Sequence, residues 1–363
     1  MKSFLDIVDL TTDELYDLIH TALDIIEHPA KYAEACKGKK LATLFFEPST
    51  RTRLSFEAAM YELGGNVLGF GDASGTSVAK GESLADTAKV ISCYADVIAM
   101  RHPLEGAPLI AALNADIPVI NAGDGGHNHP TQTLADLLTI YREKGTFSDL
   151  TVGLCGDLKY GRTVHSLIAA LSRYQNIKFV LISPEELRLP GYVKELIDPD
   201  KGFSYVEERD LSKAIPELDV LYMTRVQRER FDDPNEYERL KDVYILTEDK
   251  LAGAKEDMII MHPMPRVNEI SVKVDKDKRA CYIKQVANGK YMRMALILKL
   301  LEEARKNPRN LITLPEEFIG RGMECKNPKC VSRVERDVVQ AFKRTHNPDL
   351  VRCVYCDCKH PLK

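Results

Sequence analysis

The sequence has no long hydrophobic run and no strong excess of either charge. Its apolar stretches stay well below the roughly 18 residues of a membrane-spanning helix. The 50 lysines and arginines against 54 aspartates and glutamates leave a net charge of −4, which argues against a dedicated nucleic-acid or membrane surface. Residues 1–17 carry several acids and no signal-peptide layout, so we expect a cytoplasmic protein. The length of 363 residues allows two domains and a small appendage.

Cysteine is scarce in the first 300 residues and crowded afterwards. The four scattered cysteines, Cys36, Cys93, Cys155 and Cys281, are expected to be small buried hydrophobic residues. The other five fall within 325–358, where a C-x4-C pair is followed, 22 residues later, by a C-x2-C pair. Such pairs suit a closed tetrahedral zinc site with four thiolate ligands. The predicted metal ligands are Cys325, Cys330, Cys353 and Cys356.

Two alternatives remain for this segment. The cysteines could form disulfides, although a cytoplasmic compartment disfavours them. Cys358 and His360 are further candidates for the fourth metal ligand.

Strand-like and helix-like segments alternate through residue 306. Strands are expected at 40–46, 66–70, 97–100, 118–121, 151–157, 179–182, 204–207, 220–223 and 258–261. Helices are expected at 12–27, 54–63, 82–95, 106–115, 130–144, 161–174 and 285–306. This alternation is typical of parallel sheets covered on both faces.

The predicted fold class is therefore α/β, with two doubly wound parallel-sheet domains and a small C-terminal four-cysteine zinc domain. The predicted boundaries are 1–133 with 286–306 packing back, 134–285, a linker at 307–322 rich in proline and glycine, and 323–363.

The polar segment 45–53, Phe-Phe-Glu-Pro-Ser-Thr-Arg-Thr-Arg, lies at a strand-to-helix junction. Free backbone N–H groups and the helix dipole favour an anion there. Ser49, Thr50 and Thr52 add hydroxyl donors, and Arg51 adds a planar fork suited to phosphate oxygens. The alternative is an ordinary helix N-cap with two solvated arginines.

Further polar clusters follow other predicted strands. They occupy 101–106, 127–132, 157–163, 224–227 and 262–266. Because ligands bind at the carboxyl ends of strands in such sheets, five clusters in register point to a binding site.

These motifs together resemble those of the aspartate carbamoyltransferases over residues 1 to about 306, and the phosphate loop is shared with ornithine carbamoyltransferases. The resemblance implies transfer of the carbamoyl group of carbamoyl phosphate to L-aspartate, giving N-carbamoyl-L-aspartate for pyrimidine biosynthesis, without a catalytic cofactor. The late motif at 262–265, His-Pro-Met-Pro, lacks the cysteine typical of ornithine carbamoyltransferases.

The resemblance also implies residue roles. Carbamoyl phosphate would be bound by Ser49, Thr50, Arg51, Thr52, Ser77, Lys80, Arg101, His129, Gln132, Pro263 and Met264, the last standing where leucine is usual. Those expected to act in catalysis are Arg51, Thr52, Lys80, Arg101 and His129. L-Aspartate would be bound by Lys80, Arg162, Arg225 and Gln227.

In this family Ser77 and Lys80 match residues that reach into a neighbouring subunit, which implies a homotrimer with shared sites. The C-terminal segment resembles the zinc domain of the aspartate carbamoyltransferase regulatory chain, which would link trimers. The expected cofactor is a structural Zn²⁺, and no nucleic-acid or membrane partner is expected. Two rivals are a carbamoyltransferase for another amine and a zinc-ribbon scaffold or nucleic-acid protein with an inert α/β body. The intact set of site residues weighs strongly against the second rival, the inert body.

Overall fold

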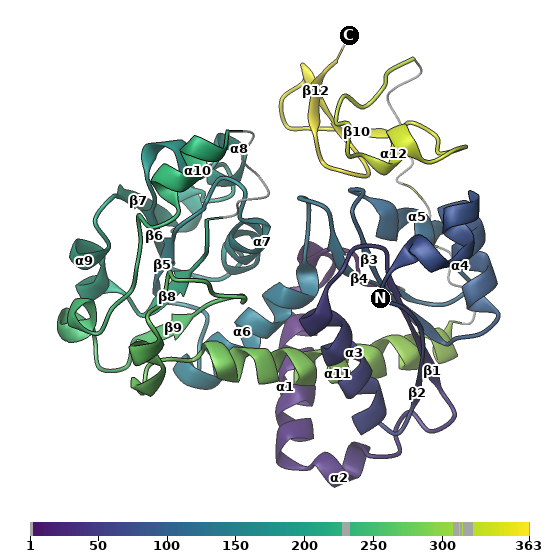
Figure 1. Ribbon diagram of the computed structural model, residues 1–363, viewed down its shortest axis with the longest axis horizontal. Helices are drawn as coiled ribbons and strands as arrows, with labels where there is room; N and C mark the ends of the chain where they lie inside the picture. Colours follow the sequence, from purple (N-terminus) through teal and green to yellow (C-terminus); the bar gives the residue numbers. More distant parts are fainter. Residues whose placement is uncertain (1–2, 227–232, 308–311, 313, 315–321, 363) are drawn as a thin grey trace. The chain divides into compact units, whose positions relative to one another are not determined.

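The computed structural model describes residues 3–226, 233–307, 312, 314 and 322–362 (Figure 1). The chain divides into two compact units, one formed by Met1–Thr131 with Lys290–Lys363 and the other by Gln132–Gly289. The predicted linker at 307–322 lies mostly outside the described residues. None of the described helices combines the length and the apolar character that crossing a membrane requires.

The first unit contains a parallel sheet of four strands in the order β2-β1-β3-β4. Its strands are β1 (Lys40–Phe45), β2 (Asn66–Phe70), β3 (Val97–His102) and β4 (Val119–Asp124). Its helices are α1 (Thr12–Glu27), α2 (Pro29–Tyr32), α3 (Thr50–Glu62), α4 (Leu84–Ser92) and α5 (Ala107–Asn114). From β1 the chain continues to β2, which lies on one side of β1. It then crosses to β3, on the other side of β1, so the strand order reverses between β1 and β3. Open α/β sheets bind ligands at such a switch point.

Hydrophobic patterning accounts for these elements. All five residues from Leu41 to Phe45 are buried, as a strand covered on both faces requires. Helix α1 begins at a capping box formed by Thr11 and Glu14 and buries one apolar stripe. Helices α4 and α5 pack on one another, while α3 packs on β1 and β2.

Strand β3 is longer than the sequence predicts. Arg101 and His102 lie inside the strand, because Arg101 pairs with Phe45 of β1 and His102 pairs with Asp124 of β4. Both polar residues join the ladder because strands on either side extend just as far. The predicted loop after β3 therefore begins at Pro103.

The second unit has a parallel sheet in the order β7-β6-β5-β8-β9. Its strands are β5 (Thr151–Cys155), β6 (Lys178–Ile182), β7 (Ser204–Glu208), β8 (Val220–Met223) and β9 (Ile259–Met261). Its helices are α7 (Arg162–Leu171), α8 (Gly191–Lys194), α9 (Leu211–Ala214) and α10 (Pro234–Leu240). Helices α6 (Pro130–Lys144) and α11 (Tyr282–Lys306) run through the division between the units. Here the strand order reverses between β5 and β8.

The C-terminal segment is a small antiparallel sheet in the order β10-β11-β12, preceded by one turn of helix. Its elements are α12 (Val331–Val334), β10 (Phe342–Arg344), β11 (Leu350–Cys353) and β12 (Lys359–Pro361). This four-cysteine domain belongs to the first unit, and its core residues Phe342 and Tyr355 form one buried cluster with Ile110 and Ala111 of α5.

Backbone contacts fix that packing. Glu105 donates its N–H to the carbonyl of Lys329 at 2.8 Å and accepts from the N–H of Val331 at 2.9 Å. Gly106 has a φ of +84°, and a Cβ there would lie 2.6 Å from both the Cβ and the carbonyl oxygen of Tyr355. Glycine is therefore required at 106 by conformation and by space.

Candidate active site and metal centre

The segment predicted to bind phosphate occupies the switch point of the first sheet. It follows β1 and leads into α3, whose first turn contains Thr50, Arg51 and Thr52. Ser49 lies at the N-cap position with φ −154° and ψ 89°, yet in the described structure its hydroxyl makes no capping hydrogen bond to the helix. Ser49 therefore holds the N-cap position, as the alternative interpretation expects, but without a capping hydrogen bond. The first turn of a 13-residue helix presents backbone N–H groups and a positive dipole end that suit an anion.

Arg101 reaches this loop from the neighbouring strand. Its Nη2 lies 2.5 Å and its Nε 3.1 Å from Oε1 of Glu47, which precedes the helix. Its side chain is only 12% exposed, so the charge is held in place beside the segment 47–52. The carbonyl of Arg101 also accepts from the N–H of Phe46 at 2.9 Å. Strand register and hydrogen bonds thus bring Arg101, from the cluster at 101–106, next to the segment 45–53.

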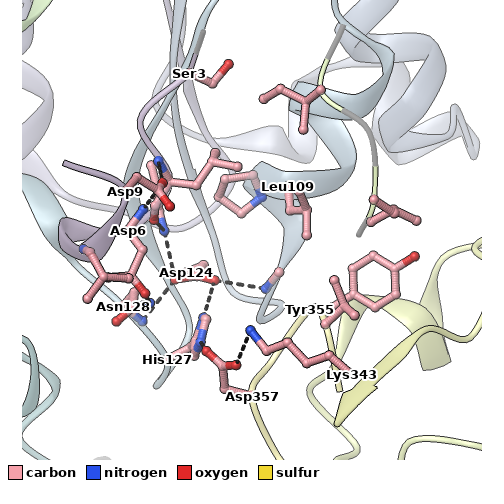
Figure 2. A pocket seen from close by; sticks show the side chains of 18 residues that line it. Ser3, Asp6, Asp9, Leu109, Asp124, His127, Asn128, Lys343, Tyr355 and Asp357 are labelled. Atoms are coloured by element: carbon pink, nitrogen blue, oxygen red, sulfur yellow. Dashed lines mark hydrogen bonds and ion pairs between the residues drawn. The ribbon is translucent and has the colours of Figure 1, made fainter. Parts of the chain in front are cut away.

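The loop after β4 carries His129, which is buried at the start of α6. Two residues earlier, His127 lies between two carboxylates (Figure 2). Its Nδ1 is 2.9 Å from Oδ2 of Asp124, and its Nε2 is 3.1 Å from Oδ2 of Asp357 in the four-cysteine domain. Burial opposes the charged imidazolium, but the two carboxylates outweigh it and hold the pKa of His127 well above its usual value.

Beside this bridge lies a cavity of about 440 Å³. Figure 2 shows Asp6, Asp9, Lys343 and Tyr355 around it, so both the N-terminal segment and the four-cysteine domain form its walls. Burial is the main cause that raises the pKa of Asp6 and of Asp9.

Ser77 and Lys80 lie on a short 3₁₀ helix, Ser77–Lys80, where both residues are exposed. Gly81 ends it in the left-handed conformation. In the sequence this 3₁₀ helix lies between β2 and α4. It is therefore not part of the loops that follow β1, β3 and β4.

The two arginines predicted to bind aspartate, Arg162 and Arg225, lie at the switch point of the second sheet. Arg162 begins α7 after β5, and Arg225 follows β8, the partner strand of β5. Thr224 ties the two loops together, because its Oγ1 accepts from the N–H of Asp157 at 3.0 Å and donates to the carbonyl of Cys155 at 3.0 Å. Gln227, predicted to act beside Arg225, lies outside the described residues.

Three predicted contacts for the carbamoyl group lie in the second unit. Gln132 is on α6, and Pro263 and Met264 follow β9. The N–H of Met264 donates to Nδ1 of His262 at 2.8 Å, so the turn is anchored from a buried histidine.

The four predicted metal ligands converge. The sulfur atoms of Cys325, Cys330, Cys353 and Cys356 lie within 4.8 Å of one another, and all four residues are buried. Two of the separations are 3.5 Å and 3.7 Å. A tetrahedral site with Zn–S bonds of about 2.3 Å has sulfur atoms about 3.8 Å apart, whereas a disulfide needs about 2.05 Å. The geometry fits a metal and is wrong for disulfides.

Cys358 and His360, the further candidates for the fourth metal ligand, lie outside this cluster. Sγ of Cys358 is 3.9 Å from the carbonyl of Lys359, and His360 stacks edge-on against Phe342 at 5.4 Å between ring centres. Neither belongs to the cluster of four sulfurs.

Three protein-family models match the chain. The carbamoyl-P binding domain of the aspartate/ornithine carbamoyltransferases matches residues 2–142, and the Asp/Orn binding domain matches residues 148–300. The metal binding domain of the aspartate carbamoyltransferase regulatory chain matches residues 317–362. The chain belongs to the aspartate/ornithine carbamoyltransferase family and carries this metal binding domain at its C-terminal side.

Its relatives narrow the resemblance to one branch of that family. The aspartate carbamoyltransferase catalytic subunit of Clostridium novyi is 60% identical over 300 residues, covering 83% of this chain and 98% of that protein. The corresponding subunit of Lachnoclostridium phytofermentans is 61% identical over 301 residues, with the same coverage. The solved catalytic subunit of M. jannaschii aspartate transcarbamoylase is 46% identical, with a TM-score of 0.79 over 84% of this chain and 99% of that chain. The Trypanosoma cruzi enzyme, solved with N-(phosphonacetyl)-L-aspartic acid, is 39% identical, with a TM-score of 0.77 over 82% of this chain and 95% of that chain.

Sequence reasoning missed the residues that hold the predicted ones in place. Glu47 was part of the phosphate motif, but its pairing with Arg101 depends on strand register. The bridge from His127 to Asp357 spans 230 positions and has no sequence signal. Asp136 did have a sequence signal. It follows Gln132 by four positions on a predicted helix, so the two side chains lie on the same face.

Proposed function

We propose that this enzyme transfers the carbamoyl group of carbamoyl phosphate to the α-amine of L-aspartate, giving N-carbamoyl-L-aspartate and phosphate, a step of de novo pyrimidine biosynthesis. The observation that carries the proposal is the placement of charge at the two switch points. The first sheet has a helix N-terminus with Arg51 and Arg101, and the second has Arg162 and Arg225. The first set suits a phosphate, and the second suits a dicarboxylate.

Carbamoyl phosphate binds through its phosphate to the first turn of α3. Ser49, Thr50, Arg51 and Thr52 supply donors, with Arg101 beside them. Ser77 and Lys80 come from an adjacent subunit. This arrangement would fix the phosphate by charge-assisted hydrogen bonds, which are the strong ones.

The reaction needs no covalent intermediate with the protein. The aspartate amine attacks the carbamoyl carbon, a C–N bond forms, and the C–O bond to phosphate breaks. The proton lost by the amine passes to the departing phosphate. Negative charge grows on the carbonyl oxygen during attack, and Thr52, Arg101 and His129 are the donors we assign to it, since preorganised donors of this kind supply large rate effects.

Substrate choice follows from charge in the second unit. Arg162 and Arg225, with Gln227, bind the two carboxylates of L-aspartate, together with Lys80. Two guanidinium groups would repel the side-chain cation of ornithine. An enzyme for another amine is the remaining alternative.

The four-cysteine site binds zinc. Four thiolates at tetrahedral spacing are the donor set of structural zinc sites. The metal, once bound, supplies cross-linking of the four ligands and no part of the reaction.

We further propose a cytoplasmic homotrimer in which each subunit lends Ser77 and Lys80 to its neighbour, with zinc domains able to link trimers. The domains are assigned as 1–133 with 286–306 for carbamoyl phosphate, 134–285 for aspartate and 323–363 for zinc.

An assay of the purified full chain tests the proposed reaction. With carbamoyl phosphate and L-aspartate, colorimetric detection should find N-carbamoyl-L-aspartate. Ornithine in place of aspartate should give no carbamoylated product. Product from ornithine or another amine, with none from aspartate, would overturn the assignment.

A further inference from the structure

One carboxylate of the second unit is fully buried and accepts hydrogen bonds from three side chains. Asp136, on α6, has no exposed surface. Its Oδ1 accepts from Nε2 of Gln132 at 2.8 Å and from Nε2 of Gln285 at 2.6 Å, and its Oδ2 accepts from the hydroxyl of Tyr222 at 2.9 Å. Three donors compensate for the loss of water around a buried negative charge.

The accepting oxygen of Asp136 determines which way the amide of Gln132 faces. An ionised carboxylate only accepts hydrogen bonds, so it must meet the NH₂ end of the amide. Oε1 of Gln132 is then turned away from Asp136 and is available as an acceptor. Burial, followed by the charge of Asp136, raises the pKa of Tyr222 well above its usual value, which keeps that hydroxyl a donor to the same carboxylate.

Hydrogen bonds also connect Asp136 to the turn after β9. Gln285 also gives its NH₂ end to Asp136, and its Oε1 accepts from the N–H of His262 at 2.9 Å. His262 in turn accepts the N–H of Met264 through Nδ1 at 2.8 Å. Since Nδ1 is the acceptor, Nε2 carries the proton and donates to Glu269 at 2.6 Å.

Met264 is held in an unusual backbone conformation by this anchoring. Its φ is +53°, in the left-handed region that side-chain-bearing residues seldom adopt. Its N–H is committed to His262, inside the second unit. The orientation of the carbonyl groups at Pro263 and Met264 therefore depends on a chain of buried hydrogen bonds that ends at Asp136.

We infer that Asp136 is a positioning residue that makes the carbamoyl-amine end of the site a set of acceptors. That end is formed by the contacts that the family resemblance already implies for the carbamoyl NH₂ group, namely Oε1 of Gln132 and the carbonyl oxygens of Pro263 and Met264. This inference rests on the proposed function. The inference adds to the proposed function that the enzyme's selectivity for carbamoyl phosphate over an acyl phosphate depends on Asp136, a residue that does not touch the substrate.

The selectivity has a physical basis. Acetyl phosphate has a methyl group where carbamoyl phosphate has the amine, with nearly the same shape. A methyl group would leave these acceptors without a donor, and sites built to hydrogen-bond an N–H reject such analogues strongly. If Asp136 no longer fixed the Gln132 amide, the amide could turn and the penalty against the methyl group would fall.

The test compares the two acyl donors in the full-length enzyme. The quantity measured is kcat/KM for carbamoyl phosphate divided by kcat/KM for acetyl phosphate, at saturating aspartate. In Asp136→Leu we expect this ratio to fall by about tenfold or more, the equivalent of one lost hydrogen bond to the substrate. Tyr222→Phe is the matched control, because it removes one donor from the same carboxylate without touching Gln132, and its ratio should stay at the wild-type value.

The conservative variant gives a second readout. Asp136→Asn keeps an oxygen that can accept from Gln132 and Gln285, while the Tyr222 hydroxyl can turn to accept from the new NH₂ group. We expect it to recover most of the wild-type ratio. If the leucine variant does not fold, as judged by thermal unfolding, Asp136→Ala is measured in its place, because it leaves space for water.

The outcomes separate this inference from the proposed reaction. Wild-type enzyme that forms no N-carbamoyl-L-aspartate refutes the proposed function, whatever the variants do. A folded Asp136→Leu or Asp136→Ala enzyme that loses rate equally with both donors, so that the ratio is unchanged, shows a purely structural residue and overturns the inference.

Discussion

Arg51 lies in the first turn of α3, where its guanidinium adds a full positive charge to the partial charge of the helix N-terminus. We expect Arg51→Ala to fold normally and to lose about 10²–10³ in kcat, as when one preorganised donor is removed. Steady-state kinetics with a thermal unfolding check would measure this.

Lys37→Ala is the control for that experiment, because Lys37 is an exposed cation that pairs with Glu34 before β1. It should keep wild-type kinetics. Near-normal turnover in folded Arg51→Ala would contradict the assignment of Arg51.

His102 makes folding stability depend on pH. It is buried against Phe46, and its Nδ1 accepts from the N–H of Leu104 at 3.0 Å. Burial lowers its pKa from 6.5 to about 4. Between those values the unfolded chain binds a proton that the folded chain does not. The free energy of unfolding should therefore fall as the pH drops from 6.5 toward 4, by about 3 kcal/mol, and this dependence should vanish above 6.5.

The variant His102→Asn isolates this dependence. Asparagine can accept the N–H two residues later but does not titrate. Urea unfolding at several pH values should give a flatter profile than wild type between pH 4 and 6.5. Identical slopes in the two proteins would show that His102 is not responsible.

At the residue scale the sequence supports proposed roles for particular side chains, but it does not show what holds those side chains in place. Arg51 and Ser49 could be recognised because the loop is contiguous in the chain. The pairing of Arg101 with Glu47 could not, since it depends on β1 and β3 being neighbours in register. The orientation of the Gln132 amide depends on Asp136, which had no assigned role in the sequence.

Among the elements, helix α6 was predicted with both ends right, because Pro130 suits a first turn and the amphipathic pattern ends before Gly145. Strand β3 was predicted too short. Arg101 and His102 are polar, so local pattern ended the strand at 100, whereas hydrogen bonding to β1 and β4 extended it. Tertiary pairing overrode local propensity there.

The contact between Gly106 and Tyr355 allows a sharp test of how the four-cysteine domain packs. In Gly106→Ala the new Cβ would overlap Tyr355, so we expect loss of that packing as well as the strain of a left-handed alanine, which is about 1–2 kcal/mol. Limited proteolysis should cut the C-terminal segment faster than in wild type.

Gly38→Ala is the matched control. Gly38 has a similar φ of +79° but no atom within 4 Å of an added Cβ. It should show the backbone strain in its melting temperature without faster proteolysis of the C-terminal segment. Equal proteolysis of both variants and wild type would contradict the packing described for Gly106.

At the scale of the whole molecule, we expect metal binding to stabilise the rest of the first unit. Zinc analysis should find about one ion per chain, since a single closed site of four cysteines is present among the described residues. The domain shares its buried core with α5, so chelation should do more than unfold a tail. Hydrogen exchange in 103–114 should rise when the metal is removed.

Two results would contradict this coupling. Carefully purified protein without metal would refute the site itself. Unchanged exchange in 103–114 after complete zinc removal would show that the domain core does not depend on the ion. The sequence predicted the ligands from their spacing, but the packing against α5 involves residues more than 200 positions apart and could not be predicted from it.

The proposed sharing of active sites between subunits would be a property of the assembled molecule alone. Lys80 is exposed on its 3₁₀ helix and, as a lone lysine, would ordinarily be a solvated surface charge. In a closed ring each subunit can give its loop to the next. We expect Lys80→Ala and Arg162→Ala each to be nearly inactive. When they are mixed in equal amounts and reassembled, about three quarters of the rings contain both variants, and about one site in three of those carries neither defect. Activity should therefore return to roughly a quarter of wild type. If hybrid rings form and the mixture stays as inactive as its parents, Lys80 acts within its own chain or has no part in the site.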